Sequence, residues 1–278
     1  MTSGESKRTG LLQGLSVFLS ASVPNRPGFP RNSEAATEID EAVVSFTRAV
    51  LAERGVIVFG AHPSISPLVA SVASEYVSPE LHTAPPPEVE SIGKPVRQGP
   101  RVVIYQSHAY DGYVPDKTWH MYRFGYADLV WCARQAGETF EPKEKKVQCP
   151  HSLRYMRRKL FEMESPAVMA AIGGMEGVLD EADLFLEYLH MRDQPPPPAP
   201  IYALETTGGA AGMLRTRVPS FVHQVEEEWK LEMPPGAAEI ELRSDPRART
   251  FVPYPLIMQW LVRKIADSPA GVAASFRK

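Results

Sequence analysis

Short apolar runs alternate with segments long enough to be helices, and this alternation constrains the fold of the 278-residue chain more than any other feature. The runs cover residues 15–20, 56–60, 101–107, 167–172 and 200–205. A strand that is apolar at successive positions is buried on both faces, as in a parallel sheet covered by helices. We therefore predict an α/β fold with a Rossmann-like, doubly wound, mainly parallel sheet flanked by helices.

Amphipathic segments between the runs predict the covering helices. The clearest spans residues 34–54, has one apolar face and ends at Gly55, a residue type that favours helix termination. Further helices are expected up to residue 76, over 152–163, from the glycines at 173–177 to residue 190, from the TTGGAAG stretch to residue 229, and over 255–266. The aromatic segment before Cys149 shows no clear pattern.

Length and composition favour one domain. The chain is 44% hydrophobic and 23% charged, and α/β folds often continue as a single unit for about 250 residues. We expect residues 1–13 to be loose and residues 14–278 to form a single domain. The proline-rich segment 77–100 is interpreted as an insertion, and Pro195–Pro198 as a stiff spacer.

The charge and the cysteines argue against several classes of function. A net charge of -3 with mixed signs provides no basic surface for nucleic acid or an anionic membrane. No apolar stretch approaches the ~18 residues that cross a bilayer, and Gly14 and Ser16 interrupt the N-terminal run that imitates a signal peptide. Cys132 and Cys149 form no CxxC pair and the histidines show no ligand spacing. We expect a cytoplasmic protein with no disulfide framework, metal site or cofactor.

Small, hydroxyl-bearing and glycine residues follow the ends of the predicted strands. In a parallel sheet these ends meet at one edge, where ligands bind. Glycine lets backbone approach a ligand closely, and helix N-termini beside it favour a phosphate. The ligand-binding candidates at these ends are Ser20, Ser22, Arg26, Gly60, His62, Ser64, Gly173, Gly174, Glu176, Gly177, Thr207, Gly208 and Gly209. We favour a phosphate- or nucleotide-binding crevice here, although each motif alone is also compatible with a tight turn.

Two common nucleotide-binding signatures are absent. No GxGxxG follows the first run and the chain has no GxxxxGK[ST], so dehydrogenase and P-loop chemistry lack their signatures.

Several acidic residues have interpretations that need no ligand. Acids at 180–183 near a helix start could stabilise the helix dipole without any ligand. The acidic run Glu226–Glu228 is interpreted as a solvated helix face.

Five segments together resemble the SLOG superfamily, over residues 15 to 212: SASVPNRP, FGAHPSISPL, SLRYMRRKL, IGGMEGV and TTGGAA. This superfamily of Rossmann-like domains contains the LOG-type phosphoribohydrolases, the DprA-like proteins and nucleotide-sensing domains found beside TIR and Sir2 modules. The segments look most like the branches found in bacterial conflict and signalling systems. The resemblance implies that residues 14–278 form a SLOG-like nucleotide-binding domain.

LOG enzymes cleave the N-glycosidic bond of a nucleoside 5'-monophosphate, and their signature is an Arg-Lys pair on a helix followed by PGGxGTxxE. By resemblance, the arginine falls on Arg157 or Arg158, and the glutamate falls on Glu181. The chain departs from the signature at Ile172 in place of proline and at Glu176-Gly177 in place of Gly-Thr, with the acid displaced by one position. These departures put the hydrolase activity in doubt, so whether the chain is an enzyme stays open.

The first hypothesis is therefore a domain that binds a nucleotide or an NAD-derived, ADP-ribose-like ligand, as a sensor in bacterial signalling or defence. The alternative is a phosphoribohydrolase in which Glu181 and Arg157 are catalytic. A third is a structural protein with a vestigial crevice. Related folds often dimerise through helices, which favours a homo-oligomer, and a signal would pass to a separate effector protein.

Overall fold

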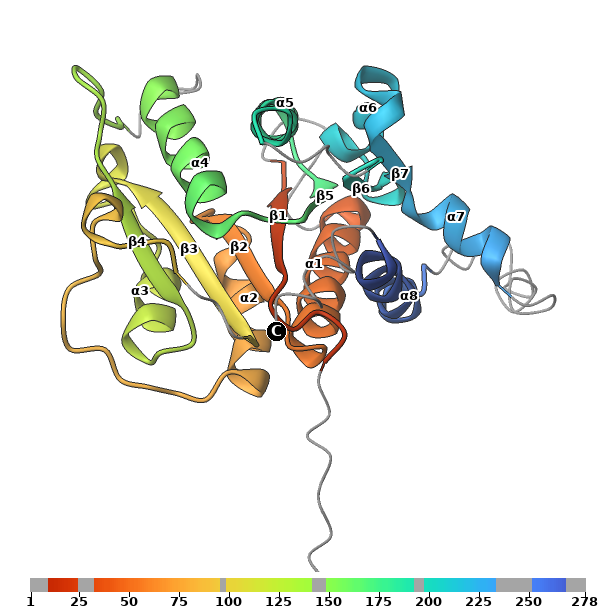
Figure 1. Cartoon of the computed structure of the whole chain (residues 1–278), viewed down its shortest axis with the longest axis horizontal. Helices are drawn as coiled ribbons and strands as arrows, with labels where there is room; N and C mark the ends of the chain where they lie inside the picture. Colours follow the sequence, from red (N-terminus) through yellow and green to blue (C-terminus); the bar gives the residue numbers. More distant parts are fainter. Residues whose placement is uncertain are drawn as a thin grey trace, which may run out of the picture.

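Parallel strands form the centre of the protein in a computed structural model that describes residues 10–24, 33–95, 99–141, 149–192, 198–233 and 252–268. Within these residues the strands make a seven-stranded sheet in the order β4-β3-β2-β1-β5-β6-β7. Every pairing of neighbouring strands is parallel. Helices cover both faces (Figure 1), which confirms the predicted Rossmann-like α/β class.

Each predicted apolar run forms a strand. These strands are β1 (Ser16–Ser22), β2 (Val56–Gly60), β3 (Arg101–Ser107), β5 (Val168–Gly173) and β6 (Ile201–Leu204). Two further strands were not predicted, β4 (Asp128–Cys132) and β7 (Val222–Gln224). Both lie at the edges of the sheet. Strand β7 has only three residues, and β4 lies in the aromatic segment that shows no clear pattern.

The helices form two layers. Side chains of α4 (Pro150–Glu164), α5 (Glu176–His190) and α6 (Gly209–Arg217) share one buried cluster with one face of the sheet. The other face is covered by α1 (Glu34–Ala52), α2 (Ser66–Tyr76), α3 (Asp116–Arg123), α7 (Val225–Glu232) and α8 (Tyr254–Asp267). Short 3-10 turns are η1 (Val89–Ser91), η2 (His108–Tyr110), η3 (Glu205–Thr207) and η4 (Pro219–Phe221). No helix in the described part of the chain is long and apolar enough to span a bilayer.

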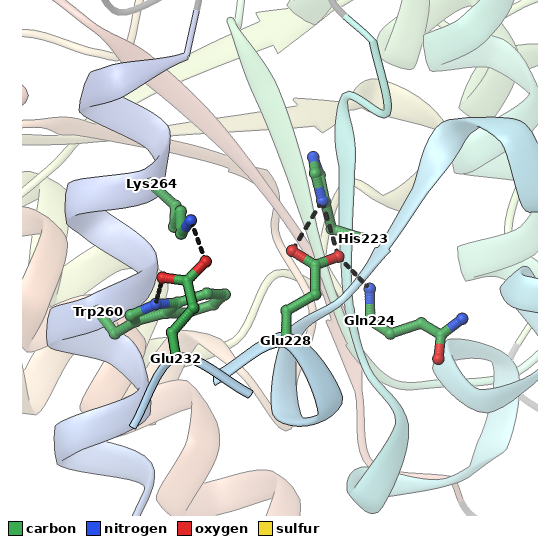
Figure 2. Close-up of polar contacts among 6 residues, drawn as sticks. All are labelled: His223, Gln224, Glu228, Glu232, Trp260 and Lys264. Atoms are coloured by element: carbon green, nitrogen blue, oxygen red, sulfur yellow. Dashed lines mark hydrogen bonds and ion pairs between the residues drawn. The ribbon is translucent and has the colours of Figure 1, made fainter. Parts of the chain in front are cut away.

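The helix predicted to end near residue 229 is instead two helices with strand β7 between them. The carboxylate of Glu228 binds the ring of His223, 2.9 Å from its Nδ1, and accepts the backbone N–H of Gln224 at 3.2 Å (Figure 2). Nearby, Glu232 of α7 accepts the indole N–H of Trp260 at 2.9 Å and pairs with Lys264, which ties α7 to α8 (Figure 2). Helical periodicity alone does not reveal this interruption because the residues of β7 are too few.

The proline-rich segment 77–100 runs beside the β4 edge, apart from residues 96–98, which lie outside the described part. The backbone N–H of Trp131 donates to the carbonyl of Pro87 at 2.9 Å, and Val89 is buried in the core. The carboxylate of Glu90 accepts a hydrogen bond from the hydroxyl of Tyr155 on α4 at 2.6 Å. This segment therefore shields part of an edge strand that would otherwise expose unpaired backbone groups.

The N-terminal segment that was predicted to be loose lies within the described residues only from Gly10 onward. Leu12 is fully buried, and its backbone N–H donates to the carbonyl of Glu53 at 3.0 Å. These residues therefore pack at the turn between α1 and β2.

Phe18 of β1 joins the sheet to the two helices that carry the candidate site. Its side chain is 1% exposed, and its ring packs edge-on against Phe161 of α4 with 5.0 Å between centroids. The ring of Phe185 on α5 lies 6.4 Å away. The relative positions of α4 and α5 thus depend on a buried aromatic cluster centred on β1.

We predict that Phe18→Ala lowers the free energy of unfolding by about 3–5 kcal/mol, because it removes buried apolar area and leaves a cavity. Urea unfolding followed by circular dichroism measures this change. Phe124→Ala is the matched control, since Phe124 is 48% exposed, and should cost less than about 1 kcal/mol. Equal losses in the two variants would contradict the central role of Phe18.

Candidate functional site

The strand order creates a switch point at the carboxyl end of β1. From β1 the chain proceeds through β2, β3 and β4 on one side, and α4 then carries it back to β5 on the other side of β1. Connections that leave in opposite directions open a crevice beyond the strand ends, which is the usual ligand site of doubly wound sheets. The residues that follow β1 and β5 are therefore the first candidates for ligand binding.

Ser20, Arg157 and Glu181 meet at this switch point from three different elements. The hydroxyl of Ser20 on β1 donates to Oε2 of Glu181 on α5 at 2.5 Å. Arg157 on α4 donates to Oε1 of the same carboxylate from Nε at 3.0 Å and lies 2.9 Å from it through Nη2. The side chains of Arg157 and Glu181 are only 11% and 17% exposed. We call these three residues the switch-point triad.

The packing of α4 selects Arg157 rather than its neighbour for this position. Met156, Leu160 and Phe161 are buried against the sheet and fix the rotation of the helix. Successive residues point about 100° apart around a helix. Arg158 therefore points elsewhere and pairs with Glu187 on the exposed surface at 2.7 Å. Arg158 thus lies outside the triad, and its part in ligand binding stays a prediction.

The turn after β5 provides the floor beside the triad. Gly173 has a φ of +60°, and a Cβ at this position would collide with the side chain of Ile39, so only glycine fits. The N–H of Gly173 donates to the hydroxyl of Thr207 at 2.8 Å, and the N–H of Gly174 donates to the carbonyl of Ser22 at 2.9 Å. These bonds join the carboxyl ends of β1, β5 and β6.

The turn after β6 packs directly on this floor. The N–H of Ala210 donates to the carbonyl of Gly174 at 3.0 Å. Gly209 has a φ of +61°, and a Cβ there would collide with the same carbonyl oxygen. Gly208 precedes it, and nothing lies within 4 Å of the position that its Cβ would occupy. The glycine turns at 173–174 and 208–209 therefore form one continuous backbone surface.

Helix N-termini at this surface differ in how they are capped. The first turn of α4 is capped from within the protein, because the carboxylate of Glu138 accepts the N–H groups of His151 at 3.0 Å and Ser152 at 2.7 Å. Burial disfavours the charged form of this carboxylate and acts to raise its pKa. The hydrogen bonds from Ser152 and His151 stabilise the charged form and outweigh that effect, so that the pKa of Glu138 is lowered. No side chain caps the starts of α5 and α6 within the described residues. At the start of α6, however, the N–H of Ala210 is already bound by the carbonyl of Gly174. The start of α5 is therefore the better placed of the two to bind an anion.

His62 and Ser64 follow β2 and form a second hydrogen-bonded group. The hydroxyl of Ser64 lies 2.8 Å from Nδ1 of His62 and accepts the N–H of Val23 at 3.1 Å. Burial lowers the pKa of His62, and the negative charge of Glu181 acts in the opposite direction. His62 is therefore a neutral ring at pH 7, near the triad.

The remaining predicted residues have less defined positions. Glu176 and Gly177 begin α5, and Glu176 is exposed with no hydrogen bond or ion pair to any other described residue. The carbonyl of Gly177 accepts a bond from Nη2 of Arg157 at 3.4 Å. Arg26 lies outside the described residues. No group of three or more His, Cys, Asp or Glu in the described chain is arranged to hold a metal ion.

Glu226 orders the turn that follows β6, a role that the sequence did not reveal. It is 5% exposed, and its carboxylate accepts the N–H of Glu205 at 3.1 Å and both the N–H and the hydroxyl of Thr206. The prediction of a solvated face for Glu226 is wrong, because η3 folds its unpaired N–H groups over this carboxylate. In sequence it is indistinguishable from exposed Glu227.

A family model provides the decisive comparison. The model described as the SLOG cluster3 family matches residues 82–232, which include α4, the triad residues Arg157 and Glu181, and both glycine turns. The chain belongs to the SLOG cluster3 family. The resemblance to the SLOG superfamily, stated on the basis of sequence segments, is thereby confirmed.

Two other comparisons add little. None of the curated proteins matches the chain. Among solved structures, the chain is similar to TM1055, a structural genomics target solved by X-ray crystallography, at 13% sequence identity and a TM-score of 0.44. That alignment covers 78% of this chain and 97% of TM1055.

We predict that Thr207→Val lowers the free energy of unfolding by about 1–3 kcal/mol, because the buried N–H of Gly173 loses its acceptor. Thr207 and Thr47 are both fully buried, but the hydroxyl of Thr47 has no hydrogen-bond partner among the described residues. Thr47→Val is therefore a matched control, and we expect it to be neutral or stabilising. Chemical denaturation of the two variants measures the difference, and equal losses would show that the hydroxyl of Thr207 is not the cause.

Proposed function

We propose that the carboxyl edge of the sheet binds a nucleotide or an NAD-derived, ADP-ribose-like ligand. The observation that carries this proposal is the switch-point triad, in which an arginine and a carboxylate from different helices converge with a serine beside two glycine turns. Removing the two charges of such an ion pair from water costs free energy, so the pair is not explained by stability alone. Polar groups at a switch point are typical of ligand sites. Membership in a SLOG family supports the same class of ligand.

The two glycine turns would receive the phosphates. The N–H groups at the start of α5, which no side chain caps among the described residues, lie next to the shared surface of Gly174 and Gly209. Helix N-termini stabilise anions through these groups and through the helix dipole. Arg157 supplies the nearby positive charge, while Glu181 would accept hydrogen bonds from ligand hydroxyls.

In a sensor, this site would couple ligand binding to the helices around it. Arg157 is on α4 and Glu181 is on α5, so a ligand that competes for either side chain changes the link between these helices. A homo-oligomer or a separate effector protein would then read that change. Signalling and defence remain predictions from the SLOG resemblance, and the cytoplasmic location remains a prediction from the cysteine content and the apolar pattern of the sequence.

A nucleoside 5'-monophosphate N-glycosidase is the second candidate. It is favoured by the fact that Arg157 and Glu181, the residues that match the LOG signature by resemblance, face one another rather than opposite sides of the sheet. A carboxylate beside the anomeric carbon stabilises an oxocarbenium-like sugar. Ser20 and Arg157 hold the carboxylate of Glu181 in a fixed position for this role.

We predict that AMP or ADP-ribose raises the melting temperature of the wild-type protein, because a ligand that binds only the folded state stabilises it by about 2.7 kcal/mol at 100 times its Kd. Arg157→Gln should abolish most of this shift. Arg158→Gln is the matched control on the same helix and should retain it, since Arg158 pairs with Glu187 at the surface. Absence of any shift with nucleotides and ADP-ribose derivatives would refute the binding proposal.

A separate measurement decides between binding and hydrolysis. For the hydrolase, we predict release of free base from AMP, detected by chromatography, and its loss in Glu181→Gln, which keeps the shape of the side chain but removes its charge. A pure binding protein would shift in melting temperature with AMP and release no base. Base release that persists in Glu181→Gln would exclude Glu181 as the catalytic carboxylate.

A further inference from the structure

The hydrogen bonds around His62 determine which of its ring nitrogens carries the proton. The backbone N–H of Ser64 donates to Nδ1 of His62 at 3.3 Å. A backbone N–H can only donate, so Nδ1 is an acceptor and carries no hydrogen. In a neutral imidazole the proton is then on Nε2, and burial keeps the ring neutral. His62 therefore presents an Nε2–H donor.

Ser64 is held in place by the chain that follows β1. Its hydroxyl oxygen accepts the N–H of Val23 at 3.1 Å, which leaves the hydroxyl proton for Nδ1 of His62, 2.8 Å away. Ser64 thus contacts the ring of His62 through both its backbone and its side chain. These contacts occupy Nδ1 and leave Nε2 without a partner among the described residues.

His62 and the triad lie at the ends of adjacent strands. The parallel register of β1 with β2 runs from Ser16 beside Val56 to Phe18 beside Val58. Beyond these pairs the two segments stay joined, because the N–H of Val23 after β1 donates to the hydroxyl of Ser64 after β2 at 3.1 Å. His62 is two residues beyond Gly60, and it senses the charge of Glu181. The Nε2–H donor and the carboxylate therefore belong to one site.

The carboxylate of Glu181 has one acceptor position left. Oε1 takes two contacts from Arg157, and Oε2 takes one from Ser20, whereas each carboxylate oxygen can accept about two hydrogen bonds. A group that contacts both this oxygen and the Nε2–H of His62 must donate to one and accept from the other. A hydroxyl does both, but an ionised phosphate oxygen cannot donate and is repelled by the carboxylate.

We propose that His62 and Glu181 together bind a ribose hydroxyl of the ligand, with Ser64 as the residue that positions His62. The site then selects ribonucleotides over nucleotides that lack that hydroxyl. This inference rests on the nucleotide binding proposed above and adds the part of the ligand that the β2 side of the crevice recognises. A site that hydrogen-bonds a hydroxyl rejects analogues without it because its own polar groups are left unpaired.

Isothermal titration with AMP, 2'-deoxy-AMP and 3'-deoxy-AMP tests the proposal. We expect the wild-type protein to bind one deoxy analogue at least about 10-fold more weakly than AMP, because that analogue loses a hydrogen bond to the charged carboxylate of Glu181 as well as the one from His62. His62→Gln should keep most of this preference, since its amide nitrogen replaces Nε2. His62→Asn places its amide near Nδ1 and should lose much of the preference, because only Glu181 is then left to bind the hydroxyl.

Ser64→Ala should reduce the preference, whereas Ser66→Ala should not. Ser66 is a neighbouring buried serine whose hydroxyl has no hydrogen-bond partner among the described residues, so it controls for the loss of a hydroxyl. Nitrogen-15 NMR of the imidazole in the ligand-free protein gives an independent readout, with the proton expected on Nε2 of His62 and redistributed in Ser64→Ala.

The outcomes separate this inference from the proposed function. If all three nucleotides bind wild-type protein equally, nucleotide binding stands and the hydroxyl contact is overturned. A proton on Nδ1 in the NMR spectrum overturns it as well, without any ligand. If neither these nucleotides nor ADP-ribose binds, the proposed function itself fails and the hydroxyl contact fails with it.

Discussion

Burial of β1 on both faces is the constraint on which the rest of the structure depends. The strand lies at the centre of the sheet between β2 and β5, and Phe18 connects it to α4 and α5 through an aromatic cluster. Parallel strands must be covered by helices on both faces. The connections on one side of β1, through α1, α2 and α3, cover one face, and those through α4, α5 and α6 cover the other. The reversal of strand order at β1 then determines where a crevice opens.

The same geometry explains why shielded charges occur at that position. Arg157 and Glu181 are mostly withdrawn from solvent, which is unfavourable for separated charges and is offset only in part by their mutual attraction and by the bond from Ser20. An apolar pair would pack against the sheet at a lower desolvation cost. Charged residues at a buried position where apolar residues would be more stable are typical of functional sites. The glycine turns, the start of α5 and the oriented ring of His62 surround this pair from three further strand ends.

Much of the fold could be predicted because buried parallel strands have a strong local pattern. Strands β2 and β3 begin and end at the predicted residues, and the glycines at 173–174 do follow a strand. Strand β7 was missed because it has only three residues, and β4 was missed because its apolar run lies within an aromatic segment that shows neither strand nor helix periodicity clearly. In the site, the choice between Arg157 and Arg158 needed the rotation of α4, which is set by contacts of Met156, Leu160 and Phe161 with other elements. Glu138 and Glu226 were not predicted as caps because each binds N–H groups more than ten residues away in sequence.

The sequence by itself determined the class of fold, the edge of the sheet where small and glycine residues collect, and the SLOG resemblance. These depend on local patterns of apolar and flexible residues, which each segment carries within itself. Only the tertiary structure decided that Ser20, Arg157 and Glu181 contact one another, that Arg158 is at the surface, and that His62 presents Nε2 as a donor. Those facts depend on distances between segments up to 161 residues apart in the chain, and such distances follow from how helices rotate and pack on the sheet rather than from any local pattern.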